Sequence, residues 1–310
     1  MTRGINAPTQ GRIDFAKAKA VYAQGGNVTE HLRKQLGVER NTPEIIEMAY
    51  DLQAGTYIAE TAKNRTFVES YTSEIAGILD SFLHDGDLLL DIGCGEMTNL
   101  SLVSAKLSRG IAALYAFDIS WSRIKVGLDF AGENMKHPAQ LQAFTADIGE
   151  IPLQSGSIDV AITSHALEPN GGREIELLRE IMRVTRRVAV LFEPSYEFNT
   201  DEGRARMDRL GYIKNLKGAA DSIGARLLDV IPLNNTFNRL NPTVAYIIEP
   251  KDGGIPQERL NTIFSDPGSD TPLTRYDNFY FSKYSGRSYP IIGGIPVLRS
   301  ASAILTSALA

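Results

Sequence analysis

Continuous apolar runs separated by polar, helix-like segments dominate the chain from residue 86 to residue 250. Strands that crossover helices bury on both faces have this continuous pattern, whereas strands with one solvated face alternate. The runs lie at 87–93, 113–119, 141–148, 157–164 and 186–194, and a closing pair follows at 225–233 and 243–250. The pattern therefore predicts an α/β fold with a doubly wound, mostly parallel, seven-stranded sheet.

The first 85 residues show a different period, because their apolar positions recur at helical spacing and no strand-like run is present. The sequence Thr-Pro-Glu at 42–44 is a helix start, with a capping residue, a proline at the first helical position and an acid in the first turn. It opens a helix predicted to continue to Ala62, and another helix is predicted over 68–82. We expect residues 1–85 to form an N-terminal helical cap or lid.

After Pro250 the composition shifts to Gly, Pro, Ser and Asp, which marks a domain boundary. Residues 251–310 are predicted to form a small β-rich module, and the small-residue tail at their end is predicted to form a terminal helix. The sequence thus divides into a helical cap (1–85), an α/β domain (86–250) and this C-terminal module.

The charge balance and the cysteine count narrow the partners and the compartment. The 310 residues carry 32 Lys and Arg against 37 Asp and Glu, so the formal net charge is −5. This acidic balance argues against affinity from counterion release, so we expect no nucleic acid partner. The N-terminus has no apolar stretch of signal-peptide length, and no run approaches the ~20 apolar residues of a membrane span. We therefore expect no membrane partner. One cysteine cannot form an internal disulfide, which is typical of the reducing cytoplasm, so we expect a cytoplasmic protein.

The strongest chemical signal is the sequence LLLDIGCGEMTNL at 88–100. A buried strand ends in Asp91, and Gly93 and Gly95 then make a tight turn where side chains would obstruct an approaching ligand. Cys94 stands between the two glycines, where its backbone rather than its thiol is expected to bind. The spacing predicts a nucleotide-type loop.

Two further acids stand at the ends of the next strands. Asp118 is placed to accept hydrogen bonds from ribose hydroxyls, and Asp147 is placed to meet an adenine. With Asp91 they would line the crevice in which open α/β sheets bind ligands. A nicotinamide dehydrogenase is the competing interpretation of the glycine turn, and Thr98, which stands where that motif has its third glycine, counts against it.

At these residues the sequence resembles the class I S-adenosylmethionine-dependent methyltransferases, over about 86–250. The resemblance implies a Rossmann-like fold, with S-adenosyl-L-methionine as the cofactor and S-adenosyl-L-homocysteine as the product. It also implies cofactor contacts: the methionine part beside Asp91, Gly93, Cys94 and Gly95, the ribose on Asp118, the adenine against Ile119, Asp147 and Ile148, and the transferred methyl beside Ser164 and His165. The chain departs from the family pattern at Met97, where a typical loop has a third glycine.

His165 is the candidate general base. Methyl transfer requires mainly that a nucleophile be aligned with the sulfonium and that water be excluded, but a hydroxyl or ammonium acceptor must also lose a proton. The ordinary pKa of histidine, about 6.5, suits that role. The alternative is a histidine that orients a loop or caps Asp159 or Glu168. Glu168 itself is predicted either to position an amine or to cap the next helix.

Three further side chains are predicted to bind the acceptor substrate. Tyr57 and Tyr71 in the helical cap would stack on it or hydrogen-bond it, the alternative being that they are core residues. Arg173 follows the flexible Asn-Gly-Gly at 170–172 and would grip a carboxylate or phosphate, unless it is a solvated helix start.

The C-terminal segment resembles the small zinc-ribbon modules that end in a Tyr-Pro-Ile and Gly-Ile-Pro-Val-Leu strand pair, the alternative being a proline-rich β-tail of other origin. In those modules two C-x-x-C knuckles hold the metal, and the matching positions here are Asp266, Ser269, Ser282 and Ser285. Serine is a poor zinc ligand beside a thiolate, so we expect the hairpins without a metal. We expect the module either to dock on the methyltransferase domain or to mediate a homodimer.

These expectations combine into one function with two alternatives. The sequence predicts an S-adenosylmethionine-dependent methyltransferase that acts by direct in-line transfer on a small-molecule acceptor, such as an amino-acid-like compound or a secondary metabolite, at O, N or S. The alternatives are a non-catalytic S-adenosylmethionine-binding partner or sensor, and an RNA or protein methyltransferase.

Overall fold

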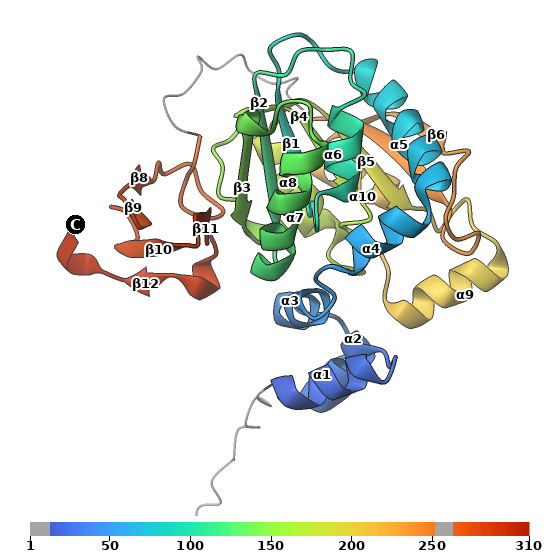
Figure 1. Cartoon of the computed structure of the whole chain (residues 1–310), viewed down its shortest axis with the longest axis horizontal. Helices are drawn as coiled ribbons and strands as arrows, with labels where there is room; N and C mark the ends of the chain where they lie inside the picture. The colour runs from blue at the N-terminus through green and yellow to red at the C-terminus, as the bar shows by residue number, and fades with distance from the viewer. Residues whose placement is uncertain (1–12, 252–262, 310) are drawn as a thin grey trace, which may run out of the picture.

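A seven-stranded sheet forms the centre of the computed structural model, which describes residues 13–251 and 263–309 (Figure 1). Its strand order is β3-β2-β1-β4-β5-β7-β6, and neighbours are parallel except at β7, which pairs antiparallel with β5 and β6. The strands are β1 (Leu88–Ile92), β2 (Ala113–Asp118), β3 (Leu141–Thr145), β4 (Ile158–Ser164), β5 (Thr185–Pro194), β6 (Arg226–Pro232) and β7 (Thr243–Glu249). The predicted doubly wound, mostly parallel fold is confirmed.

Helices cover both faces of this sheet (Figure 1). Apolar side chains of α5, α6 and α7 pack on one face, and those of α8 and α10 pack on the other. Because both faces are covered, β4 is buried from Ile158 to Thr163, which is why the continuous apolar runs predicted the sheet. The helices are α1 (Phe15–Ala23), α2 (Val28–Leu36), α3 (Pro43–Asp51), α4 (Thr56–Lys63), α5 (Arg65–Asp80), α6 (Thr98–Ser104), α7 (Trp121–Asn134), α8 (Glu174–Val184), α9 (Asp201–Leu210) and α10 (Leu216–Ile223). No described helix is both long and apolar enough to cross a membrane.

The single helix predicted from 42 to Ala62 is wrong, because the chain breaks into α3 and α4. The start is as expected, with the Thr42 hydroxyl accepting from the Ile45 N–H. Gly55 then adopts a left-handed conformation, with φ of 92°, immediately before α4. A glycine reaches this region without steric cost, so it can end one helix and let the next start in a new direction.

The helices before β1 belong to two different cores. Ala18, Leu32 and Ile45 of α1, α2 and α3 pack together in a small separate cluster. Ile75 and Leu79 of α5 instead pack on the central sheet. We use "cap" below for α1 to α4, which lie next to the carboxyl ends of the parallel strands (Figure 1).

A second, antiparallel sheet forms the C-terminal module, and it docks on the edge of the central sheet at β3. Val297 forms a parallel bridge with Thr145, and the Leu298 N–H donates to the Thr145 carbonyl at 2.9 Å. The indole of Trp121 on α7 donates to the carbonyl of Ile292. The module's strands are β8 (Thr274–Arg275), β9 (Phe279–Ser282), β10 (Arg287–Ile292), β11 (Ile295–Pro296) and β12 (Ile304–Leu305). The predicted boundary after Pro250 falls largely on 252–262, outside the described residues.

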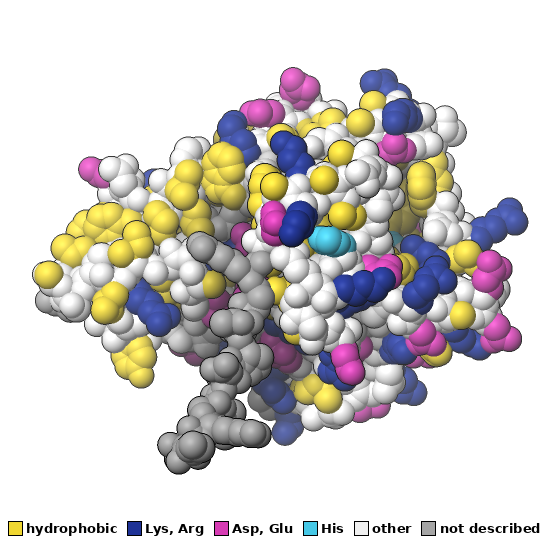
Figure 2. All heavy atoms as spheres, turned by 90° about the horizontal axis from the view of Figure 1, so that it is seen from below, with side chains coloured by type: hydrophobic (Ala, Val, Ile, Leu, Met, Phe, Trp, Pro, Cys, Tyr) yellow, Lys and Arg dark blue, Asp and Glu magenta, His cyan; other side chains and the backbone are white. Residues whose placement is uncertain are grey.

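The predicted terminal helix is wrong, because the tail pairs as a strand. β12 pairs with β10, and the hydroxyl groups of Ser288 and Thr306 lie 2.6 Å apart beside that pair. Short 3-10 turns flank the strand at Ser300–Ser302 and Ser307–Leu309. Ile304 and Leu305 are exposed, and Figure 2 shows apolar side chains gathered on this part of the molecule.

The positions that match zinc-ribbon knuckles are held by hydrogen bonds. The hydroxyl of Tyr289 donates to Asp266 at 2.5 Å, the hydroxyl of Ser269 donates to the Asp266 carbonyl, and the N–H of Ser285 donates to the Ser282 hydroxyl. Among the described residues, no group of three or more His, Cys, Asp or Glu side chains is arranged to hold a metal ion. The turns of the module are therefore maintained by polar contacts between ordinary side chains.

Candidate active site

A cavity of about 920 Å³, its mouth included, opens where β1, β2, β3 and β4 end and the cap begins. The cap contributes Pro43, Ile46, Tyr50 and Tyr57 to its wall. Most of the predicted site residues line it, namely Tyr57, Asp91, Gly93, Cys94, Gly95, Asp118, Ile119, Asp147, Ile148, Ser164, His165 and Arg173. Glu168 and Tyr71 do not line it.

The glycine turn after β1 has no room for side chains. Gly93 and Gly95 have φ of 69° and 55°, and a Cβ on Gly93 would lie 2.4 Å from the Cβ of Ala166. The N–H of Cys94 donates to the carbonyl of Phe117, which ties the turn to the end of β2. The turn is thus a fixed backbone surface that faces the cavity, as a nucleotide loop requires.

Met97 takes the place of the third glycine of the family pattern and keeps its left-handed backbone, with φ of 55°. A side chain in this region costs of order 1 kcal/mol or more. The Met97 side chain is fully buried among the apolar residues under α5 and α6, and this burial offsets the strain. The departure from the family pattern therefore leaves the shape of the turn intact.

Asp91 is a buried acid whose carboxylate lines the cavity. Burial and then the neighbouring charge of Asp118 raise its pKa to about 8. None of the described residues donates a hydrogen bond to this carboxylate. A cationic group of a ligand would supply the missing partner and favour the ionised form.

Asp118 is also buried, but its carboxylate is already held by the backbone. One oxygen accepts from the N–H of Gly95 and the other from the N–H of Ser120, each at 2.9 Å. A carboxylate has about four acceptor positions, so two hydrogen bonds leave room for ribose hydroxyls. The same contacts fix the carboxylate beside the glycine turn.

Asp147 and Arg173 lie together at the end of the cavity after β3. The Asp147 carboxylate accepts from the Gly149 N–H at 2.7 Å and lies 3.7 Å from the Arg173 guanidinium. Arg173 also forms a hydrogen-bonded ion pair with Glu176 at 2.5 Å. The positive charge predicted to grip a substrate is therefore matched by two carboxylates of the protein.

His165 follows β4 with a left-handed backbone, φ of 56°, and both its ring nitrogens have partners. Nδ1 lies 2.6 Å from the carboxylate of Glu168, and Nε2 lies 2.8 Å from the hydroxyl of Thr243. Burial alone would lower the pKa of His165, but the hydrogen bond and the charge of Glu168 outweigh burial and raise it. Glu168 therefore acts on the cavity through His165.

Two more polar residues, Glu193 and Tyr71, are buried behind the cavity wall. The fully buried Glu193 accepts from the N–H groups of Ala166, Leu167 and Glu168, so it holds the loop after β4, and burial raises its pKa to about 7. Tyr71 packs in the sheet core, and burial raises its pKa to about 12.

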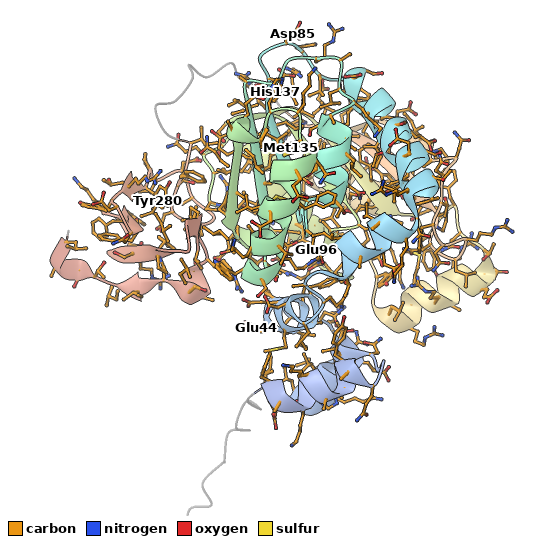
Figure 3. The ribbon with its side chains drawn as sticks, viewed as in Figure 1. Glu44, Asp85, Glu96, Met135, His137 and Tyr280 are labelled. Carbon is orange, nitrogen blue, oxygen red and sulfur yellow. The ribbon has the colours of Figure 1, made fainter. Side chains whose placement is uncertain are left out.

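The predicted site residues did not include Glu96 or Arg123, which join the cap to the glycine turn. The buried carboxylate of Glu96 accepts from the N–H groups of Gly55, Tyr57 and Ile58, at 3.0, 3.4 and 2.9 Å, and so caps α4 (Figure 3). Arg123 on α7 lies over the rings of Tyr57 and Tyr50. The only available signal was a charged residue inside a glycine turn, and it did not reveal a partner 41 residues away.

The architecture and the site define a class. A sheet in this order with one antiparallel strand, a glycine turn after β1 and acids at or just after the ends of β1, β2 and β3 give the chain the Rossmann-like methyltransferase fold. Residues 90–192, which run from β1 to β5, match the family described as a methyltransferase domain. A comparison with curated protein sequences gives no match.

Solved structures with the same fold include proteins of several activities. A complex of the Haloferax volcanii Trm112 methyltransferase activator with a methyltransferase matches at 13% identity and a TM-score of 0.48, over 65% of this chain and 97% of that one. The Streptomyces coelicolor geranyl diphosphate C-methyltransferase matches at 11% and 0.46, over 59% and 79%. The [4+2]-cyclase SpnF matches at 15% and 0.45, over 57% and 80%. These likenesses carry no information about the acceptor.

Proposed function

We propose that this protein transfers a methyl group from S-adenosylmethionine to a small-molecule acceptor held between the cap and the loop after β4. The observation that carries the proposal is the continuous cavity, which runs from the glycine turn and Asp118 to His165 and is closed on one side by Tyr50 and Tyr57. The acidic net charge supports a metabolite rather than a nucleic acid as acceptor. The acceptor atom stays open among O, N and S.

The cavity fits the cofactor in shape and in charge. The turn at Gly93 and Gly95 offers backbone where side chains would clash, and Asp91 offers a buried carboxylate without a partner among the described residues. When bound, S-adenosylmethionine supplies an activated methyl group. In our proposal Asp91 and the turn with Cys94 bind the methionine part, Asp118 binds the ribose, and Ile119, Asp147 and Ile148 bind the adenine.

The residues after β4 are proposed to form the acceptor side. Ser164 and His165 line the cavity there, and Glu168 holds His165 in place and raises its pKa. Because His165 already shares both nitrogens, it can take a proton from a hydroxyl or ammonium acceptor only when its hydrogen bond to Thr243 gives way. A thioether acceptor loses no proton, and for it His165 has a positioning role only.

Methyl transfer to a panel of small hydroxyl, amine and thioether compounds tests the proposal. We expect one chemical class to give a product with the mass of one added methyl group. His165→Ala should lower kcat by roughly 10²-fold or more for a hydroxyl or ammonium acceptor and by only a few-fold for a thioether. Ser157→Ala, remote from the cavity, is the control. Binding of S-adenosylhomocysteine without any turnover would favour the alternative of a non-catalytic sensor.

A further inference from the structure

Arg123 is a buried cation in the wall of the cavity that has no hydrogen-bonded counterion. Its side chain is 8% exposed, and its guanidinium donates no hydrogen bond to a described residue. The ion pair that it makes is long, with Nε at 3.9 Å from Glu96. That Glu96 oxygen already accepts from the N–H groups of Gly55 and Tyr57, so it is a weak partner for the guanidinium.

The aromatic rings of the cap hold this guanidinium in place. It lies 4.5 Å from the ring centre of Tyr57 and 5.3 Å from that of Tyr50. Cation–π contacts of this kind favour a cation but do not replace its lost hydrogen bonds. The rings therefore orient Arg123 before a ligand arrives. Its N–H groups are left free to donate hydrogen bonds to that ligand.

The guanidinium lies on the glycine turn itself. A Cβ on Gly95 would stand 2.5 Å from its Nη2, so the absence of a side chain at Gly95 makes room for Arg123. The other arginine of the cavity, Arg173, is paired with Glu176 and Asp147. Among the described residues that line the cavity, Arg123 is thus the cation with unused donors.

Asp91 and Arg123 are an acid and a cation beside one turn, and each lacks a hydrogen-bonded partner of opposite charge. An α-amino-acid group has an ammonium and a carboxylate on neighbouring atoms, so it is the ligand group that matches this pair. The buried carboxylates of Asp118 and Glu96 attract the charge of Arg123, but neither accepts a hydrogen bond from its guanidinium. A neutral ribose would offer only weaker hydrogen bonds than the charge-assisted ones of a carboxylate.

We propose that Arg123 binds the carboxylate of the methionyl part of S-adenosylmethionine, opposite Asp91, which binds the ammonium. This rests on the proposed placement of the cofactor in the cavity. Arg123 then selects ligands that carry the whole amino-acid group over analogues that lack the carboxylate, and it links that group to the cap through Tyr50 and Tyr57.

Two ligands that differ in one group test this assignment by calorimetry. S-adenosylhomocysteine carries the carboxylate, and S-adenosyl-3-thiopropylamine lacks it. We expect the wild-type protein to bind the first ligand roughly 10- to 100-fold more tightly, as charge-assisted hydrogen bonds allow. Arg123→Gln should remove this preference by weakening S-adenosylhomocysteine alone, and Arg123→Lys should restore part of it because the charge remains without the guanidinium fork.

Arg173→Gln is the matched control, since it removes an arginine from the same cavity whose charge is already paired. It should leave the ratio of the two dissociation constants unchanged. An Arg123→Gln protein that weakens both ligands by the same factor, or neither, would overturn the assignment. Because both ligands are measured on each variant, a general loss of stability cannot imitate the expected result. Failure of the wild-type protein to bind either ligand would instead contradict the placement of the cofactor.

Discussion

Cofactor binding should release a proton from Asp91. The group is buried, faces no donor among the described residues, and has a pKa raised to about 8. At pH 7 it is therefore mostly protonated in the free protein. A bound ammonium group favours the ionised carboxylate, so the proton must leave when the ligand arrives.

The size of the effect follows from this pKa. With a pKa of about 8, roughly a tenth of the molecules carry an ionised Asp91 at pH 7, so ionisation costs about 1.4 kcal/mol of the binding free energy. Ligand affinity should then rise roughly 50-fold between pH 6 and pH 8, and about 0.9 protons should be released per ligand at pH 7.

Calorimetry with S-adenosylhomocysteine measures both quantities. Titrations at pH 7 in buffers of different ionisation enthalpy give the number of protons released, and titrations at pH 6, 7 and 8 give the affinity profile. Asp91→Asn is the comparison, because it keeps the shape of the side chain and removes the titration. The difference between the two proteins isolates Asp91 from the other ionisable groups nearby, such as His165 in the cavity wall and Glu193 behind it.

A flat affinity profile in the wild-type protein, with no proton release, would refute the reasoning. It would mean either that Asp91 is already ionised at pH 6 or that the ligand does not contact it. Equal slopes in the wild-type and Asp91→Asn proteins would assign the titration to another group. A flat profile together with an unchanged affinity in Asp91→Asn would remove Asp91 from the proposed cofactor site.

Three further predictions concern stability. Gly93→Ala should lose more unfolding free energy than Gly156→Ala. Both glycines have a left-handed backbone, but a Cβ on Gly93 would lie 2.4 Å from the Cβ of Ala166, whereas a Cβ on Gly156 would meet nothing within 4 Å. About 1 kcal/mol is expected at Gly156 and clearly more at Gly93, and equal losses in urea denaturation would contradict this. Glu168→Gln should lower the melting temperature most between pH 5 and neutrality. The pKa of Glu168 is lowered in the folded protein, so its contribution to stability is lost as the pH falls through that pKa. The pKa of His165 is raised, so its contribution to stability is lost as the pH rises through the raised pKa. A pH-independent difference in melting temperature would argue against this pair. Arg299→Ala removes the ion pair that joins the C-terminal module to Glu47 of α3. The loss should lower the free energy of unfolding by about 1–2 kcal/mol and no more, because the Glu47 carboxylate is partly exposed. An unchanged denaturation midpoint would contradict this role of the pair.

The fold was predictable because its pattern is local. Strands buried on both faces appear as continuous apolar runs, and parallel strands bring Asp91, Asp118 and Asp147 to one edge whatever the details of the connections. For the same reason most of the predicted cofactor residues line one cavity. Their contacts with the cofactor stay predictions.

The parts that the sequence did not reveal depend on contacts between distant residues. The break between α3 and α4 is fixed by Glu96, which supplies acceptors to N–H groups some 40 residues earlier. Tyr57 and Tyr71 have similar positions in helical segments, yet α4 faces the cavity and α5 packs on the sheet. Nothing in the sequence of α7 distinguishes Arg123 from a surface arginine. It lies in the site because its guanidinium packs against the backbone of Gly95.

Phe264 has a consequence for how the chain must fold. Its ring packs edge-on against Phe144 of β3, at 5.2 Å, and against Tyr115 of β2, and on its other side it meets Tyr280 of the C-terminal module. Residues on both sides of the predicted boundary after Pro250 thus share one apolar core. A protein shortened before this residue would leave β3 as an unprotected sheet edge with aromatic surface beside it, which is a template for self-association. The C-terminal residues therefore cover the β3 edge of the central sheet, and a chain that lacks them should aggregate rather than remain a smaller soluble protein.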